Sequence, residues 1–263
     1  MKLSLITTHF HDFGWTDLCV HQVVETTPSA LLCEILIVDQ DRNDSSRSHL
    51  QALDDRVRVL QYPRSEQHCS VTGHDHAHVL NQAVSEARGT HVCILDSDAH
   101  PISACWVETC ERLLRNYDAI LAQDPRNSEF SHPCFMLLGA AHLGLGLKFD
   151  KDLFERNIDT GRLIAEQLRR AQVRVLLAPP EAGFGGRWGS LYMSCIYHHG
   201  QGSFAGGGSR LRSQLTWRHK IYRDAVVKDR TYHLKPLRLL DYCIRRLKYK
   251  LMPMKKLRVE EST

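Results

Sequence analysis

The chain has 263 residues, of which 43% are hydrophobic and 24% are charged, and its net charge is +4. This composition is ordinary for a globular protein, and the length suits one large domain or one domain with an appendage. No apolar run is long enough to span a bilayer and the N-terminus has no signal-peptide pattern, so we expect a cytoplasmic protein.

Strands and helices are predicted to alternate in the first half of the chain. The predicted strands span residues 3–7, 34–38, 57–60 and 92–95. The predicted helices span residues 17–24, a segment around Leu50, 73–87 and 106–114, with a loop up to Gly14 and with Gly89 ending the third helix. This alternation is typical of βαβ units and predicts an α/β fold with a mostly parallel sheet flanked by helices.

The second half is less regular. Strands are predicted at residues 119–122, 134–138 and 173–177, and a helix at 160–171 with Asp159 as its N-cap. Nine of the sixteen glycines lie between Gly183 and Gly208. Because Trp188 and Phe204 also lie there, we interpret this segment as a lid over a crevice rather than as a flexible linker.

The nine cysteines show no C-x-x-C spacing, and several lie in or beside apolar runs. The cysteines in or beside apolar runs are Cys33, Cys93, Cys134 and Cys195. We interpret them as reduced, buried thiols of a cytosolic protein.

The segment 90–101, THVCILDSDAHP, is the chemical centre of the sequence. A buried strand ends in Asp96-Ser97-Asp98, and ligands bind at the carboxyl ends of strands in open α/β sheets. Two carboxylates held together repel each other unless a cation lies between them. Hard oxygen ligands suit Mg²⁺ or Mn²⁺, which bind through carboxylates and substrate phosphates. The alternative is a polar turn, because Asp and Ser both favour turns.

Five segments, in order, resemble the family 2 glycosyltransferases with the GT-A fold. They are TTHF after the first strand, EILIVDQDRND, GHDHAHVLNQAVSEARG, THVCILDSD and HPCFMLLG. The resemblance covers about Met1 to His199. It implies a GT-A catalytic domain over residues 1–209, with 210–263 as a basic helical extension. The implied reaction is transfer of a sugar, with inversion, from a UDP-, GDP- or dTDP-sugar to a glycan or lipid-linked acceptor in polysaccharide biosynthesis.

The resemblance also assigns roles to individual positions. Asp98 resembles the direct metal ligand, and Asp96 the residue that contacts ribose or reaches the metal through water. Asp39 resembles the residue that binds the base or ribose, with an Asx-turn as the alternative. The whole implied nucleotide-sugar set is Thr7, Thr8, His9, Asp39, Asp41, Asp75, Asp96 and Ser97. The metal would neutralise the charge of the leaving nucleoside diphosphate.

Such an enzyme also needs a base for the acceptor hydroxyl. Family members often carry Glu-Asp at the start of a helix in the second half, and this sequence has Asn157-Ile158-Asp159 instead. Asp159 is the candidate base, with Asp150 and Asp152 as alternatives and a simple helix cap as the structural explanation.

Histidines supply further candidates. His198 and His199 follow a strand-like segment, and some related enzymes use a late histidine as a metal ligand. Adjacent residues of an extended chain point to opposite sides, so at most one of the two should face the metal. His74, His76 and His78 recur every second residue, which spreads them around a helix and makes a zinc site there unfavourable.

The end of the chain is strongly basic. From Arg210 onward it has 16 Lys and Arg against 5 Asp and Glu, a net charge of +11, which leaves −7 for the rest. Leucines and Ile244 recur at helical spacing between Leu237 and Leu251. A basic amphipathic helix of this kind suits peripheral contact with the anionic inner face of a membrane, packing on the catalytic domain, or a homodimer. No nucleic-acid-binding module is recognised.

Two other functions fit parts of the sequence. A nucleotidyltransferase also places carboxylates at strand ends, but TTHFHDFGW is not a glycine-rich phosphate loop. A catalytically silent GT-A-like binding protein is the second, because Glu-Asp is missing.

Overall fold

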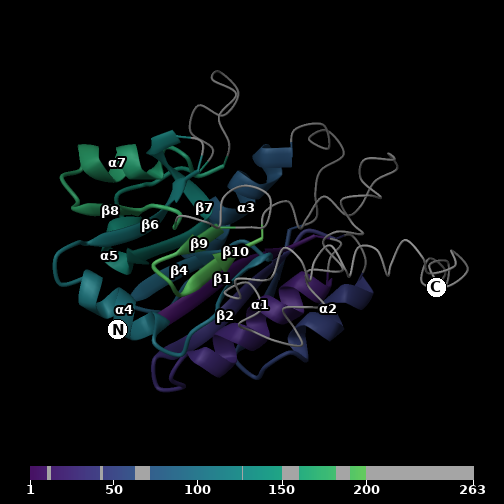
Figure 1. Ribbon diagram of the computed structural model, residues 1–263. Helices are drawn as coiled ribbons and strands as arrows, with labels where there is room; N and C mark the ends of the chain where they lie inside the picture. The colour runs from purple at the N-terminus through teal and green to yellow at the C-terminus, as the bar shows by residue number, and fades with distance from the viewer. Residues whose placement is uncertain are drawn as a thin grey trace, which may run out of the picture. The chain divides into compact units, whose positions relative to one another are not determined.

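The computed structural model describes residues 1–10, 13–41, 44–62, 72–125, 127–149, 160–181 and 190–199 (Figure 1). All of them lie in the compact unit Met1–Ser203. The predicted boundary at 209/210, the basic extension and most of the glycine-rich segment lie outside the described residues. None of the described helices is long and apolar enough to cross a membrane.

Within the described residues, the central sheet has seven strands in the order β3-β2-β1-β4-β7-β6-β8. They are β1 (Leu3–His9), β2 (Leu32–Asp39), β3 (Val57–Gln61), β4 (His91–Leu95), β6 (Ala119–Asp124), β7 (Asn127–Gly139) and β8 (Val175–Ala178). Only β7 runs antiparallel to its neighbours in this sheet. The prediction of a mostly parallel α/β sheet is therefore confirmed.

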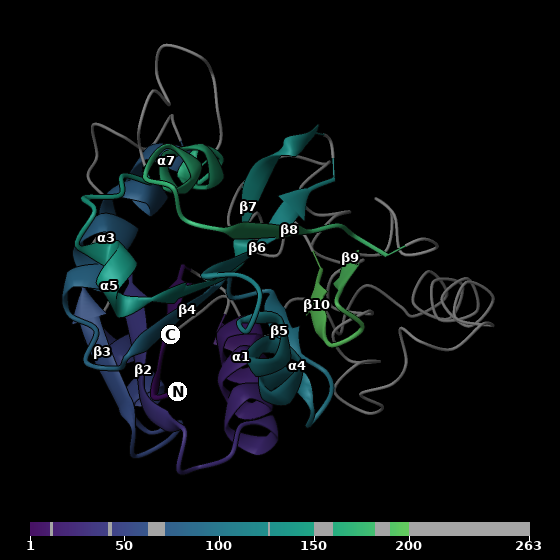
Figure 2. The ribbon, with the colours of Figure 1, turned by 90° about the vertical axis from the view of Figure 1, so that its left-hand side faces the viewer.

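Helices cover both faces of this sheet (Figure 2). The described helices are α1 (Phe13–Thr26), α2 (Asp44–Gln51), α3 (Thr72–Ser85), α4 (Trp106–Leu113), α5 (Ala140–Leu143) and α7 (Ile164–Arg170). One apolar core packs α1, α2 and α4 against the sheet, and the other packs α3 and α7 against the opposite face. Leu5 and Ile6 of β1 point into different cores, which is why the strand is a continuous apolar run.

A small antiparallel sheet lies beside the end of β4. It pairs β10 (Ile196–His198) with β5 (Ala99–Pro101) on one side and with β9 (Ser190–Tyr192) on the other. β5 begins directly after Asp98, so its pairing with β10 brings the second half of the chain next to the predicted Asp96-Ser97-Asp98 site.

Several predicted boundaries are wrong for identifiable reasons. The predicted loop up to Gly14 is too long, because α1 begins at Phe13. β7 extends back through Pro133, which is tolerated because the β6 register jumps there from Leu121↔Met136 to Ala122↔His132. Cys33 is exposed, in contrast to the other three cysteines predicted to be buried, because its neighbours Leu32 and Glu34 occupy the buried positions of β2.

The helix predicted at 160–171 begins later than expected. α7 starts at Ile164 with Leu163 as its N-cap, so Asp159 is not the cap. The Ala165 N–H instead donates to the Ser131 hydroxyl, 3.3 Å away on β7. A residue from another element thus does what a local cap was expected to do.

Gly89 does not end a helix either, since α3 stops at Ser85. A Cβ at Gly89 would lie 2.6 Å from the Ser4 backbone nitrogen and 2.7 Å from the Lys2 carbonyl oxygen. The glycine therefore permits a close approach of two backbones at the start of β1.

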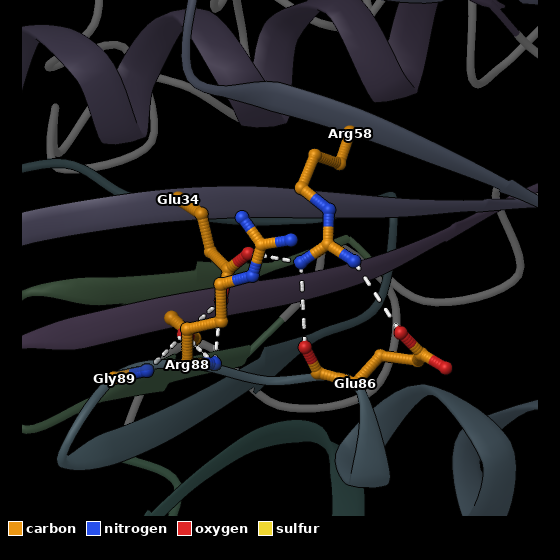
Figure 3. A network of polar contacts seen from close by, with 6 residues as sticks. Glu34, Arg58, Glu86, Arg88 and Gly89 are labelled. Carbon is orange, nitrogen blue, oxygen red and sulfur yellow. Dashed lines mark hydrogen bonds and ion pairs between the residues drawn. The ribbon is translucent and has the colours of Figure 1, made fainter.

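A polar network holds this amino-terminal edge of the sheet together (Figure 3). Glu34 is 4% exposed and accepts hydrogen bonds from the Ser4 hydroxyl (2.7 Å), the Arg88 N–H (2.6 Å) and the Arg58 guanidinium (2.6 Å). The Gly89 N–H donates to the Ser4 hydroxyl at 2.8 Å. The loop between α3 and β4 is thereby tied to β1, β2 and β3.

These hydrogen bonds also set the ionisation of Glu34. Burial by itself raises the pKa of this carboxyl, but donation by Ser4, Arg88 and Arg58 outweighs it and holds the pKa below the ordinary 4.5. A depressed folded-state pKa gives stability that is present above about pH 4.5 and is lost as the pH falls through the folded value.

We predict that Glu34→Gln lowers the free energy of unfolding at pH 7 by about 1.5–3 kcal/mol, because an amide is a weaker acceptor than a carboxylate. The variant should also lack part of the wild-type loss of stability below pH 4.5. Denaturant unfolding at several pH values measures both effects. Glu86→Gln is the matched control, since Glu86 is 48% exposed and meets Arg58 only at 3.4 Å. Equal losses in the two variants would contradict the central place of Glu34.

Candidate functional site

The ends of three parallel strands bring the first group of predicted residues together. In the register of β1 and β2, His9 is opposite Asp39, and in that of β1 and β4, Thr7 is opposite Leu95, the residue before Asp96. Carboxyl ends of parallel strands meet at one edge, which is where α/β proteins bind ligands. The sheet therefore gathers these segments as the sequence predicted.

Backbone hydrogen bonds fix the Asp96-Ser97-Asp98 turn. The Ala99 N–H donates to the Asp96 carbonyl at 2.8 Å, and the His199 N–H donates to the Asp98 carbonyl at 2.9 Å. The Asp98 side chain is 7% exposed and the Asp96 side chain 19%. Two partly desolvated carboxylates are thus held by main-chain contacts that do not depend on their charges.

His198 faces these two carboxylates. Its Nε2 lies 3.4 Å from Asp98 Oδ1 and 3.9 Å from Asp96 Oδ2. One ligand atom from each of the three residues lies within 4.8 Å of the others. Two carboxylate oxygens and one imidazole nitrogen form a donor set that suits Mn²⁺, and the mutual repulsion of the carboxylates gives a cation there a favourable field.

His199 lies on the other side of β10. Its ring packs 4.7 Å from that of Trp15 between centroids, and its Nδ1 is 3.0 Å from the Tyr197 hydroxyl. The alternation expected for adjacent residues of a strand is observed, with His198 as the member that faces Asp96 and Asp98.

The charge on His198 responds to its surroundings. Burial by itself lowers the pKa of this imidazole, but neighbouring Cys134 and Asp98 raise it well above 6.5. Asp98 therefore favours the imidazolium when no cation is present, and a divalent cation would have to displace that proton.

His76 is a neighbour of the site that the sequence did not assign. It comes from the first half of α3, and its Nε2 lies 3.7 Å from Asp96 Oδ1. The spacing of the three histidines argued against a shared zinc site but said nothing about the carboxylates facing the helix. The side chains of His74 and Asp75 lie outside the described part of the chain.

A second group lies at the ends of β1 and β2. Asp39 is fully buried, and its Oδ1 accepts the Asp41 N–H at 3.0 Å, as in an Asx-turn. His9 bridges Asp41 (Nε2 to Oδ2, 3.3 Å) and the Thr16 hydroxyl (Nδ1 to Oγ1, 2.8 Å). The ligand atoms of His9, Asp39 and Asp41 all lie within 4.8 Å of one another.

The two predicted threonines differ in exposure. Thr7 is 0% exposed and lies beside the buried Cys19, whereas Thr8 is partly exposed. Ser97 is buried within the turn. Asp159, Asp150 and Asp152 lie outside the described residues.

The sequence model of Glycosyl transferase family 2 matches residues 4–133, slightly under half of the chain. No curated protein sequence matches the chain.

Three solved structures of low sequence identity share the fold. Mannosyltransferase PcManGT from Pyrobaculum calidifontis, in complex with GDP-Man and Mn²⁺, is 14% identical, with a TM-score of 0.54 over 87% of this chain and 64% of its own. GalNAc-T7 with UDP, GalNAc and Mn²⁺ is 11% identical, with a TM-score of 0.55 over 97% and 56%. S. aureus TarS is 16% identical, with a TM-score of 0.50 over 67% and 35%.

The chain thus spans less than two thirds of the length of each of these structures. At such identities the likeness concerns the fold. Residues 4–133 match glycosyl transferase family 2 in sequence, and the described part of the chain has the GT-A fold.

Proposed function

We propose that the chain is a metal-dependent glycosyltransferase of family 2. It moves a sugar from a nucleoside-diphosphate sugar to a glycan or lipid-linked acceptor, with inversion. The observation that carries this proposal is the convergence of Asp96, Asp98 and His198 within 4.8 Å at the carboxyl edge of the sheet. The family match to residues 4–133 supports it, as does the Mn²⁺ in complexes of PcManGT and GalNAc-T7.

The donor set fits a divalent cation, Mn²⁺ or Mg²⁺, held by Asp96, Asp98 and His198. Such a cation supplies charge neutralisation for the departing diphosphate. The protein's own contribution is positional, because the turn hydrogen bonds at Ala99 and His199 hold both carboxylates before any ligand arrives. Preorganised charge of this kind costs no reorganisation during the reaction.

In this proposal the nucleoside of the sugar donor binds beside His9, Asp39 and Asp41. A carboxylate at a strand end accepts hydrogen bonds from base or ribose donors. Thr8 is the partly exposed threonine of this segment, whereas Thr7 is fully buried. Asp75 and Ser97 complete the set of residues proposed to bind the nucleotide-sugar.

The proposed acceptor base is Asp159, with Asp150 and Asp152 as alternatives. All three belong to the segment 150–159, and the described residues that flank it are hydrogen-bonded, with the Gly161 N–H donating to the Phe149 carbonyl at 3.0 Å. The Phe149 N–H in turn donates to Asn81 Oδ1 at 2.9 Å on α3. Because α3 also presents His76 to Asp96, these contacts support a base from this segment.

We also propose that the basic extension contacts an anionic membrane surface at the cytoplasmic face, with a homodimer as the other role for its apolar stripe. Its charge of +11 from Arg210 onward supports the first role. Cosedimentation with anionic and neutral vesicles tests it directly.

We predict that the chelated protein regains Mn²⁺ binding on titration and that Asp98→Asn weakens this binding about 100-fold or more, because the carboxylate charge is lost. Electron paramagnetic resonance of free Mn²⁺ measures it. Asp55→Asn, an exposed carboxylate outside the site, is the matched control and should bind as wild type does. Unchanged affinity in the Asp98 variant, with the fold intact by circular dichroism, would overturn the metal assignment.

We expect a panel of UDP-, GDP- and dTDP-sugars to be hydrolysed or transferred only with Mn²⁺ or Mg²⁺, and chelation to stop turnover. Asp98→Ala should lower kcat/KM by about 100-fold or more for the responsive donor. Activity within a few-fold of wild type in this variant, or turnover unaffected by chelator, would refute the proposal.

We predict that Asp159→Asn lowers kcat about 100-fold or more while donor affinity stays near wild type, because the base acts on the acceptor hydroxyl. Single-turnover rates and donor titrations separate the two quantities, and product NMR reports the anomeric configuration. Retained configuration would exclude single displacement, and lost donor affinity with surviving kcat would show a structural role for Asp159.

A further inference from the structure

A second cluster of ligating atoms adjoins the carboxylate site. His132 and Cys134 of β7 and His198 of β10 each place a ligand atom within 4.8 Å of the others. The ring centroids of His132 and His198 lie 5.0 Å apart, and the Cys134 thiol lies beside both imidazoles. Cys134 is fully buried and His198 is 9% exposed, so the cluster is shielded from water.

The strand itself brings two of the three groups together. His132 and Cys134 lie on either side of Pro133 in β7. The register jump of β7 against β6 occurs at this point, and the Cys134 N–H donates to His132 Nδ1 at 3.1 Å. This hydrogen bond holds the His132 imidazole against the Cys134 backbone, and β10 brings the His198 ligand atom within 4.8 Å of those of His132 and Cys134.

We propose that His132, Cys134 and His198 bind a thiophilic divalent cation of the Zn²⁺ class. Cysteine sulfur and histidine nitrogen are both Zn²⁺ ligands, and three protein ligands leave a fourth position open. The Asp96–Asp98 pair offers only oxygen, which suits Mn²⁺ or Mg²⁺. The two donor sets therefore select different ions, although they share His198.

Binding has two local costs. Burial raises the pKa of the Cys134 thiol, so a cation must displace its proton before the sulfur becomes a ligand. Coordination through His132 also competes with the hydrogen bond that its Nδ1 accepts from the Cys134 N–H. A strongly thiophilic ion gains more from the sulfur ligand than Mn²⁺ or Mg²⁺ does, so it is the better candidate to offset these costs.

The shared histidine has a consequence for the carboxylate site. His198 Nε2 faces Asp98 at 3.4 Å, so an ion that engages His198 together with Cys134 draws on the same side chain. Where the proposed transferase function holds, Zn²⁺ would inhibit turnover supported by Mn²⁺. The existence of the site is independent of that function.

The test uses Co²⁺ as a spectroscopic substitute for Zn²⁺, added to the full chain after chelation. Coordination by a thiolate gives a near-ultraviolet charge-transfer band that carboxylates and imidazoles do not give. We expect the band in wild type, its displacement by Zn²⁺, its loss in Cys134→Ser and its retention in Asp98→Asn. No band in wild type, or a band that survives in Cys134→Ser, overturns the proposal.

Four other thiols provide matched controls. Cys33 and Cys105 are exposed, and Cys69 and Cys243 lie outside the described residues. Serine at each of these positions should leave the band unchanged, and a band that disappears with any of them instead overturns the assignment.

His132→Ala guards against a misfolded Cys134→Ser variant, because His132 is only partly buried. Competition with a zinc indicator should show affinity at least about 10-fold weaker in His132→Ala. Unchanged Zn²⁺ affinity in this variant, with wild-type circular dichroism, overturns the three-residue site.

Discussion

The repulsion between Asp96 and Asp98 is the constraint around which the described structure is arranged. A buried strand delivers both carboxylates to one turn, where their side chains are 19% and 7% exposed. Main-chain hydrogen bonds to their carbonyls hold the turn, so the geometry survives whatever the charge state. The unfavourable energy of the pair is then available to favour a cation, an arrangement common at sites that bind charged ligands.

The amino ends and the carboxyl ends of the strands in the central sheet carry different kinds of polar contact. At the amino-terminal edge, Glu34 and its donors join three strands to the loop that carries Gly89. At the carboxyl-terminal edge, carboxylates and histidines converge within 4.8 Å of one another in two groups, His9, Asp39 and Asp41, and Asp96, Asp98 and His198. The stabilising hydrogen bonds of Glu34 thus lie at the end of the sheet where no ligand is expected. The carboxylates that repel one another lie at the other end of the same strands.

His198 lies next to two groups of candidate metal ligands. Its imidazole lies between the oxygen donors Asp96 and Asp98 and the softer neighbours Cys134 and His132. Hard and soft ions differ in which of these they prefer. The ion that this part of the chain would prefer therefore depends on a side chain whose position is set by the pairing of β10 with β5.

Local sequence determined the parallel sheet and the position of the acidic turn. Uninterrupted apolar runs such as Ile35–Val38 indicate strands buried on both faces, and the sheet places their polar ends at one edge. The separation of His198 from His199 was equally predictable, since side chains alternate along any strand. These features could be predicted because each is indicated by a pattern within a short segment of the chain.

Tertiary structure alone decided the rest, because the groups involved are far apart in sequence. His198 reaches Asp98 only through the pairing of β10 with β5, and His132 and Cys134 reach His198 only where β7 meets that sheet. Ser131 caps α7 from another element, which no local capping pattern could reveal. Gly89 is required by the backbone of Ser4, not by the helix before it. Periodicity reports which face of an element is buried, whereas contacts between distant segments depend on how those faces pack.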